Sequence, residues 1–417
     1  MTNINHNTIL INGFQFIIYK NKDEICIGDV LKANGYHTGY IGKWHLECPS
    51  LNKSKNPIDG ATWGWDGWTP PGPRRHGFDF WYAYNTFDDH FHPHYWTGEN
   101  PQKVEIEQWS VEHETDVAIR FIKERPKDKP FALFVSWNPP HPPFVAPDKY
   151  KKIYSGGKLP PRKNDLNNKS KEQRLSYYAA VTSCDDNFGR ILETLDSLGI
   201  RNNTIVIFTA DHGEMMGSHD KFGKNVWYEE SIGIPFLIRW LNSIKPGKED
   251  LLFASYNFMP TILGLMNLPI PETVEGKDYS KILFGKKIER PTSVFLTSYA
   301  NPGKTLTIGQ DMTIWTKAGV ELREKGIDWR TVGFRGVRTE RYTYVVNRGG
   351  EETKENIGRL LYDNEKDPYQ LNPIRATYAS EHPVMLELNN ELRKWLDKMS
   401  DPFPLSMEGD LFIEENE

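Results

Sequence analysis

The sequence predicts an α/β protein with a mostly parallel central sheet flanked by helices, followed by a small C-terminal α+β domain that contains an antiparallel sheet. Three observations support this fold class. Apolar strand patterns alternate with amphipathic helix patterns through the first two thirds of the chain, as in parallel sheets. Two of these strands are apolar on both faces, so helices should cover both faces of the sheet. From about residue 333 the pattern changes to consecutive alternating strands.

The elements of the larger domain follow from these patterns in chain order. A helix is predicted to end at Asn34 and Gly35, because asparagine and glycine often terminate helices. The segment 64–96 is dense in glycine, proline and aromatic residues, and it is predicted to be one long functional loop. The other patterns predict helices at 116–125 and 176–200 and strands at 37–44, 130–137 and 204–210.

The chain is predicted to divide near residue 333. Residues 1–332 would form the α/β domain, and residues 333–417 would form the small domain of antiparallel sheet plus helix. The strands of the small domain are expected at 333–347 and 359–373, where apolar and polar residues alternate.

Composition limits the kind of protein. The chain has 417 residues, of which 38% are hydrophobic and 26% charged, as in globular proteins. Its net charge of −5 argues against nucleic-acid binding, which normally needs a basic excess. No apolar run approaches the roughly 20 residues of a membrane span, and the apolar stretch 8–20 lacks the basic start of a secretory signal. The three cysteines fit neither a disulfide framework nor a metal-site spacing.

Chemistry-bearing residues follow three of the predicted strands. In open α/β sheets the functional site lies beyond the carboxyl ends of the strands. Lys43 and His45 stand at the end of the first strand, although they would also suit one solvated strand face. His141 follows the second strand within 138–144, where prolines on both sides stiffen the backbone.

The third strand end is the most specific. Asp211 and His212 come directly after strand 204–210, and a carboxylate beside an imidazole suits a divalent cation, although two ligands do not complete a site. Lys224 follows between small or polar neighbours and is suited to meet an anion. The alternative for Lys224 is a surface salt bridge to Glu229 or Glu230, which would contribute little.

Lysines, histidines and a metal pair at one sheet edge suit an anionic ester with tetrahedral oxygens. Lysines attract the oxygens as point charges, a metal polarises the centre, and histidine supplies a proton to the leaving group. Four segments in this order resemble the formylglycine-dependent sulfatases of the alkaline phosphatase superfamily, from about residue 26 to the C-terminal domain. These segments are 35–46, 138–144, 209–240 and 258–280.

The resemblance implies an alkaline phosphatase-like fold and roles for individual residues. The implied catalytic residues are those that contact the sulfate, the nucleophile or the leaving oxygen, namely Lys43, His45, His141 and Lys224. The substrate sulfate would be bound by Lys43, His141 and Lys224. Asp211 and His212 would be ligands of Ca²⁺, the usual metal of the family.

The sequence departs from the family pattern at the nucleophile. The family's nucleophile is a cysteine, oxidised to formylglycine, in a Cys-x-Pro/Ser/Ala-x-Arg motif upstream of the Gly-Lys-Trp-His segment. These 417 residues contain no such motif. Cys48 is the nearest match, but it has Asn52 in place of the arginine and lies on the wrong side of His45. The calcium site is expected to be incomplete as well, because no pair of aspartates directly follows the stretch 8–20.

Two other acid pairs and one asparagine have simpler expected roles. Asp88 with Asp89, and Asp185 with Asp186, are predicted to be solvated or to cap turns. Asn257 stands where the family usually has aspartate, and a structural role is expected for it.

The predicted loop 64–96 contains further cations among its aromatic residues. Aromatic faces stack on sugar rings and arginine pairs with anions, so the loop is a candidate for holding a sulfated sugar. Core packing of the aromatic residues is the alternative. The basic side chains concerned are Arg74, Arg75, His92 and His94.

The sequence therefore predicts a sulfuric ester hydrolase that acts on a sulfated carbohydrate or an aryl sulfate. Hydrolysis by this chain is expected to be negligible because the formylglycine cysteine is absent, and the sequence is interpreted as a truncated or decayed copy. The alternatives are a phosphodiesterase or phosphonate hydrolase of the same superfamily, and a catalytically inactive anion-binding remnant. The resemblance implies export for many relatives, whereas no export signal is recognised here.

Overall fold

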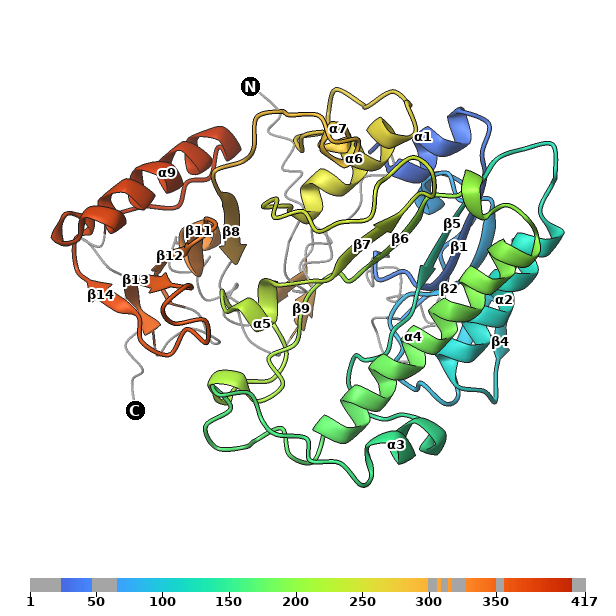
Figure 1. The fold of residues 1–417 in the computed structure, drawn as a ribbon, viewed down its shortest axis with the longest axis horizontal. Coiled ribbons are helices and arrows are strands. Elements are labelled where there is room, and N and C mark those ends of the chain that lie inside the picture. The colour runs from blue at the N-terminus through green and yellow to red at the C-terminus, as the bar shows by residue number, and fades with distance from the viewer. Residues whose placement is uncertain are drawn as a thin grey trace.

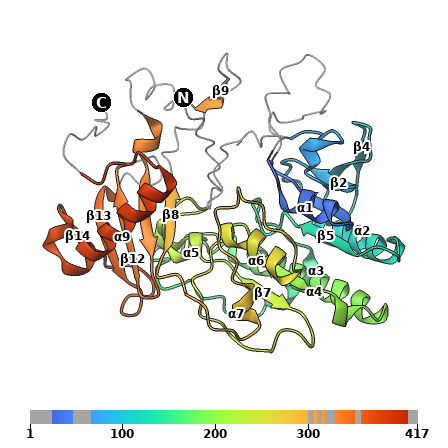
Figure 2. The same ribbon diagram turned by 90° about the horizontal axis from the view of Figure 1, so that it is seen from above.

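The computed structural model of the chain describes residues 24–46, 66–298, 306–308, 314–316, 328–349 and 356–406. Cys48 and the apolar stretch 8–20 lie outside the described residues. A central sheet lies toward one end of the molecule and the C-terminal antiparallel sheet toward the other (Figures 1 and 2).

The central sheet has five strands in the order β4-β3-β2-β1-β5. Its parallel core pairs β1 (His37–Lys43) with β2 (Phe80–Tyr84) on one side and with β5 (Phe131–Ser136) on the other. The antiparallel strands β3 (His94–Thr97) and β4 (Lys103–Glu105) extend it at one edge. The predicted α/β class is confirmed, and the predicted strands at 37–44 and 130–137 are neighbours in the sheet.

Helices α2 (Ser110–Glu124) and α4 (Arg174–Ser197) lie along one face of this sheet (Figure 1). Ile41 and Tyr82 point to that face and pack with Val117 of α2. Burying such side chains removes apolar surface from water, which is the main force that holds the layers together.

The opposite face of the same strands is also buried. Trp81 packs there with Phe78, and α1 (Ile27–Ala33) lies so close that a Cβ on Gly28 would sit 3.0 Å from the Phe78 ring. Neighbouring residues of β1 are therefore buried on opposite faces, Tyr40 on this one and Ile41 on the other. β1 is therefore covered on both faces, as a central strand of a parallel sheet normally is.

The prediction of one long loop at 64–96 is wrong. The segment contains β2, β3 and a short 3-10 helix at Pro73–Arg75. Its aromatic residues form the interior instead, and Trp96 and Tyr95 are fully buried. Aromatic residues favour strands because they pack well on a pleated surface, and this tendency outweighed the turn-forming glycines and prolines nearby.

The predicted strand at 204–210 is confirmed as β6 (Val206–Thr209). In the described residues β6 pairs antiparallel with β7 (Phe236–Arg239), in a sheet separate from the five-stranded one. The short helices of the larger region are α3 (Asp148–Tyr154), α5 (Glu229–Ile232), α6 (Phe258–Leu265) and α7 (Ser280–Leu283).

The C-terminal sheet is antiparallel throughout, in the order β14-β13-β12-β11-β8. β8 comes from upstream of residue 333 and pairs with β11, while the predicted domain boundary itself stays a prediction. A separate strand pair is formed by β9 (Leu306–Ile308) and β10 (Ile314–Thr316). The five strands are β8 (Val294–Ser298), β11 (Phe334–Arg338), β12 (Tyr342–Asn347), β13 (Gly358–Asp363) and β14 (Ile374–Ala376).

The two faces of the C-terminal sheet have different partners. Helix α9 (Pro383–Met399) covers one face, where Leu392 packs in a core with Tyr344. The other face packs against Trp227 and its neighbours, and Trp227 donates a hydrogen bond of 3.1 Å from Nε1 to the hydroxyl of Tyr362. The C-terminal sheet therefore anchors the segment that follows Lys224.

Among the described residues, none of the helices is both long and apolar enough to cross a membrane.

Candidate active site

Lys43 stands at the carboxyl end of β1 and reaches across to the end of β5. Its Nζ donates a hydrogen bond of 3.0 Å to Oδ1 of Asn138, and only 12% of the side chain is exposed. Burial lowers the pKa of Lys43; nearby Asp88 opposes this and Lys224 adds to it. The solvated-face alternative is therefore wrong for Lys43, and its charge is held inside the protein.

Asp88, whose role the sequence analysis missed, lies in the same group of charges as Lys43 and His141. Its Oδ1 is 3.6 Å from Nζ of Lys43 and 3.2 Å from Nδ1 of His141, and it accepts a hydrogen bond of 3.0 Å from Nδ2 of Asn138. Burial opposes ionisation of Asp88, but His141, Lys43 and Asn138 outweigh it and hold the pKa well below its usual range. The expected solvation or capping role is wrong for Asp88, whereas Asp89 does cap a turn by accepting from the amide of His92.

His141 is held in place by its own loop and by a second histidine. Its amide donates to the carbonyl of Asn138 at 3.0 Å, and its carbonyl lies 2.8 Å from Nε2 of His90. The imidazole keeps 25% of its side-chain surface exposed. One ring nitrogen is thus beside Asp88 while part of the ring stays open to a ligand.

His45 follows β1 in a left-handed backbone conformation, with φ of 52°, and its amide donates to the carbonyl of Asn85 at 3.0 Å. By its surface area His45 is an exposed residue, but the ring is flanked by enough protein atoms to be partly desolvated. Together with the charges of Lys43 and Lys224, this desolvation lowers its pKa to about 4. His45 is therefore neutral at neutral pH.

Lys224 is carried by a loop that Glu214 shapes. Oε1 of Glu214 accepts hydrogen bonds from the amides of Gly223 and Met216, at 2.6 and 3.2 Å. The charge of Lys224 lies close enough to lower the pKa of both Lys43 and His45. Lys224 therefore lies within electrostatic range of the residues at the end of β1.

The acids proposed as alternative partners of Lys224 are engaged elsewhere. Glu229 is 2.6 Å from Nε of Arg338, and Glu230 is 2.9 Å from Nε of Arg162. Because both acids already pair with arginines, a surface salt bridge does not explain the position of Lys224. We call Lys43, His45, His141 and Lys224 the anion site.

Asp211 and His212 adjoin the anion site, but they do not make a complete calcium site. Oδ1 of Asp211 accepts from the amide of His212 at 2.9 Å, and Nδ1 of His212 lies 2.7 Å from the carbonyl of Gly213. Calcium takes six to eight oxygen ligands. In the part of the chain that the structure describes, no group of three or more histidine, cysteine or acid ligands includes these two residues.

Two basic residues that the sequence suggested for binding a sulfated sugar have structural roles instead. Arg75 is buried and donates to the carbonyls of Thr69 and Gly98, and buried His94 lies 2.6 Å from Oδ2 of Asp66. Both side chains are therefore engaged inside the protein, which does not favour their candidate role in holding a sulfated sugar. Asn257 is buried as well, and its Oδ1 accepts from the amide of Lys277 at 2.9 Å, which supports the expected structural role.

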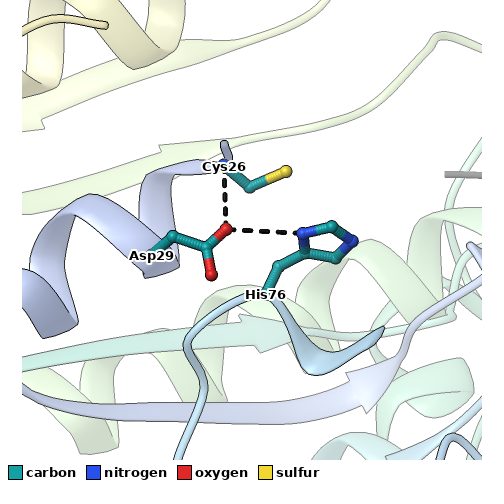
Figure 3. A group of neighbouring side chains, drawn as sticks. All are labelled: Cys26, Asp29 and His76. Carbon is teal, nitrogen blue, oxygen red and sulfur yellow. Dashed lines mark hydrogen bonds and ion pairs between the residues drawn. The ribbon is translucent and has the colours of Figure 1, made fainter. Parts of the chain in front are cut away.

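Figure 3 shows a different group of potential ligands, Cys26, Asp29 and His76. Oδ2 of Asp29 already accepts the amide of Cys26 at 2.9 Å and lies 3.4 Å from Nδ1 of His76. This is the geometry of a helix cap, because the carboxylate satisfies an amide that the first turn of α1 leaves without an intrahelical partner. The group therefore fastens the start of α1 to the turn that carries His76.

Fold and site together define a class of protein. Two lysines, neutral His45 and half-buried His141 converge at the carboxyl ends of β1 and β5, where open α/β sheets bind their ligands. Such a constellation binds the anionic oxygens of an ester and offers an imidazole for proton transfer. These features define a hydrolase of anionic esters whose site lies at the edge of an α/β sheet.

Comparison with known proteins identifies the family. The family model described as Sulfatase matches residues 1–268. The endo-4-O-sulfatase of Bacteroides thetaiotaomicron is 35% identical over 399 residues, covering 91% of this chain and 75% of the relative. The ulvan-active sulfatase of Formosa agariphila is 31% identical, covering 93% and 68%. A solved sulfatase from B. thetaiotaomicron, described with the metabolism of multiple glycosaminoglycans, has a TM-score of 0.78 at 34% identity, covering 91% and 78%.

The chain belongs to the sulfatase family, within the alkaline phosphatase superfamily. The predicted family and the sulfuric ester hydrolase class are therefore confirmed. The assignments of Lys43, His45, His141, Lys224 and the metal pair to particular roles stay predictions.

Proposed function

We propose that the anion site binds the sulfate group of a sulfated carbohydrate. Lys43, His141 and Lys224 would meet the sulfate oxygens. The observation that supports this most strongly is the pair of like charges. Lys224 lies near enough to depress the pKa of Lys43, whose charge burial already disfavours. A second positive charge close to a desolvated lysine is unfavourable by itself, and an anion between the two charges relieves the repulsion.

A carbohydrate ester is the favoured ligand because of the relatives. The two curated relatives carry the names endo-4-O-sulfatase and ulvan-active sulfatase. In our proposal His141 faces the leaving oxygen, because part of its ring remains exposed beside Lys43. Asp211 and His212 would supply two ligands of a calcium ion, and among the described residues no third histidine, cysteine or acid side chain joins them.

Binding measurements test the proposal directly. Lys43→Ala and Lys224→Ala should each weaken binding of methyl galactoside 4-sulfate about tenfold to a hundredfold, since a hydrogen bond to a charged group contributes about 1.5–3 kcal/mol. Isothermal titration calorimetry measures this. Lys394→Ala is the matched control, because Lys394 is exposed on α9 and pairs with Glu391. Equal binding of the same galactoside without sulfate would contradict the proposal.

Anion binding should take up protons at mildly acidic pH. The pKa of His45, ordinarily 6.5, is about 4 because of desolvation and the charges of Lys43 and Lys224. A sulfate between these lysines raises it again. Between about pH 4 and pH 6.5 the sulfate-bound protein therefore holds more protons than the free protein. Affinity for sulfate should consequently rise as the pH falls through this range. Calorimetry of inorganic sulfate binding, in buffers of different ionisation enthalpy at about pH 5.5, measures the uptake.

His45→Gln tests the assignment of this proton. The variant should lose most of the uptake while keeping its affinity at about pH 8, where His45 is neutral in both states. Undiminished uptake in His45→Gln would assign the proton to another group, such as His212, whose pKa is also lowered by burial.

A further inference from the structure

Asp88 places a negative charge at the edge of a site built for an anion. Its three polar contacts, to Asn138, His141 and Lys43, all reach Oδ1, at 3.0, 3.2 and 3.6 Å. Yet 46% of its side chain is exposed, compared with 12% for Lys43. The carboxylate is thus fixed at one oxygen and open to solvent elsewhere.

The position of this charge has consequences for what can bind. A sulfate on Lys43 and His141 would lie next to the carboxylate, which brings Asp88 within reach of substituents close to the sulfate ester. A carboxylate accepts hydrogen bonds from hydroxyl and amide donors and repels other anions. The low pKa of Asp88 means that it stays ionised across the usual pH range.

We propose that Asp88 is a specificity residue, which accepts a hydrogen bond from a hydroxyl or amide on the ring carbon next to the sulfate ester. The site then selects a monosulfated sugar unit over one that carries a second sulfate on the neighbouring carbon. This inference rests on the proposed function, since it requires that the anion site holds the sulfate of a sugar.

Two ligands that differ by one sulfate test the inference. Methyl galactoside 4-sulfate and methyl galactoside 3,4-disulfate are titrated into the full chain and into Asp88→Asn by calorimetry. The wild-type chain should prefer the monosulfate by about tenfold or more, because the second sulfate meets the carboxylate. Asp88→Asn should remove most of this preference, chiefly by binding the disulfate more tightly, because asparagine keeps the shape and can donate a hydrogen bond.

The control and the other outcomes separate the explanations. Asp89→Asn keeps a residue that can cap the turn and should leave the preference unchanged. An unchanged preference in Asp88→Asn, or equal weakening for both sugars, would overturn the inference, because Asp88 would then only position Lys43 and His141. If the wild-type chain bound neither sugar, the proposed function would fail and this inference with it.

Discussion

The wild-type chain is expected to lose stability as the pH rises from about 6 to about 8, and replacing Glu114 by glutamine should remove this loss. Glu114 is completely buried in α2, below the end of β1, where the Tyr95 hydroxyl donates to its Oε1 at 2.8 Å. Its Oε2 has no hydrogen-bond partner among the described residues, and a Cβ on Gly42 would lie 3.1 Å from it. Burial raises the pKa of Glu114 to about 8, which the bond from Tyr95 partly opposes.

The direction of this pH dependence follows from the number of protons that Glu114 binds in the folded and the unfolded protein. Between the ordinary pKa of 4.5 and the folded value of about 8, Glu114 is protonated when folded and ionised when unfolded. Its contribution to stability is therefore complete below the unfolded pKa and is lost as pH rises through this range, by about 1.4 kcal/mol per pH unit. Glutamine has no such proton to lose.

Urea denaturation of both proteins at about pH 6 and pH 8 measures the effect. The difference in unfolding free energy between Glu114→Gln and wild type should shift by about 2 kcal/mol in favour of the variant, because Glu114 is already half ionised at pH 8. Glu124→Gln is the matched control, because Glu124 is exposed on the same helix. A difference that stays constant with pH would show that Glu114 is already ionised in the folded protein.

Asp401→Asn is expected to destabilise the C-terminal sheet by about 3–5 kcal/mol, because it leaves a buried cation without its counter-charge. Arg335 is fully buried, and its Nε donates to Oδ2 of Asp401 at 2.6 Å. The same guanidinium donates to the carbonyls of Ser298 and Arg330, at 3.1 and 2.8 Å. The pair therefore joins β11 and the end of β8 to the chain after α9.

Two comparison variants show whether burial is the cause. Asp79→Asn removes an equally short ion pair to Lys32, but both of these side chains are about half exposed, so the loss should be at most about 1 kcal/mol. The double variant Arg335→Met with Asp401→Leu removes both buried charges and should recover much of the stability. Chemical denaturation measures all three. Equal losses for Asp401→Asn and Asp79→Asn would contradict the argument.

The elements with the clearest patterns were predictable because their patterns report local burial. β5 was predicted because a strand covered on both faces is apolar along its length, and α4 because one helical stripe faces the sheet. β1 was predicted as the segment that follows the helix end at Asn34 and Gly35. β2 and β3 were missed inside 64–96. Their residues favour strands, but the surrounding glycines and prolines carry an equally strong turn signal.

The strand-end rule also brought out Lys43, His141 and Lys224. Each follows a strand that could be recognised or lies in the loop after one, so the sequence alone indicated one shared edge. In the folded chain the charge of Lys224 acts on Lys43 and lowers its pKa, as expected for residues near one sheet edge. Asn138 could have been found in the same way, since it comes soon after β5.

The sequence by itself determined the fold class, the family and the residues at the strand ends, because these depend on patterns within short segments. Only the tertiary structure decided that Asp88 enters the anion site while Arg75 and His94 turn inward. Asp88 meets Asn138 across 50 residues of chain, and Arg75 meets Gly98 across 23. A loop side chain has no periodic pattern to mark its direction. The direction is set by which distant groups can satisfy its charge once water is excluded.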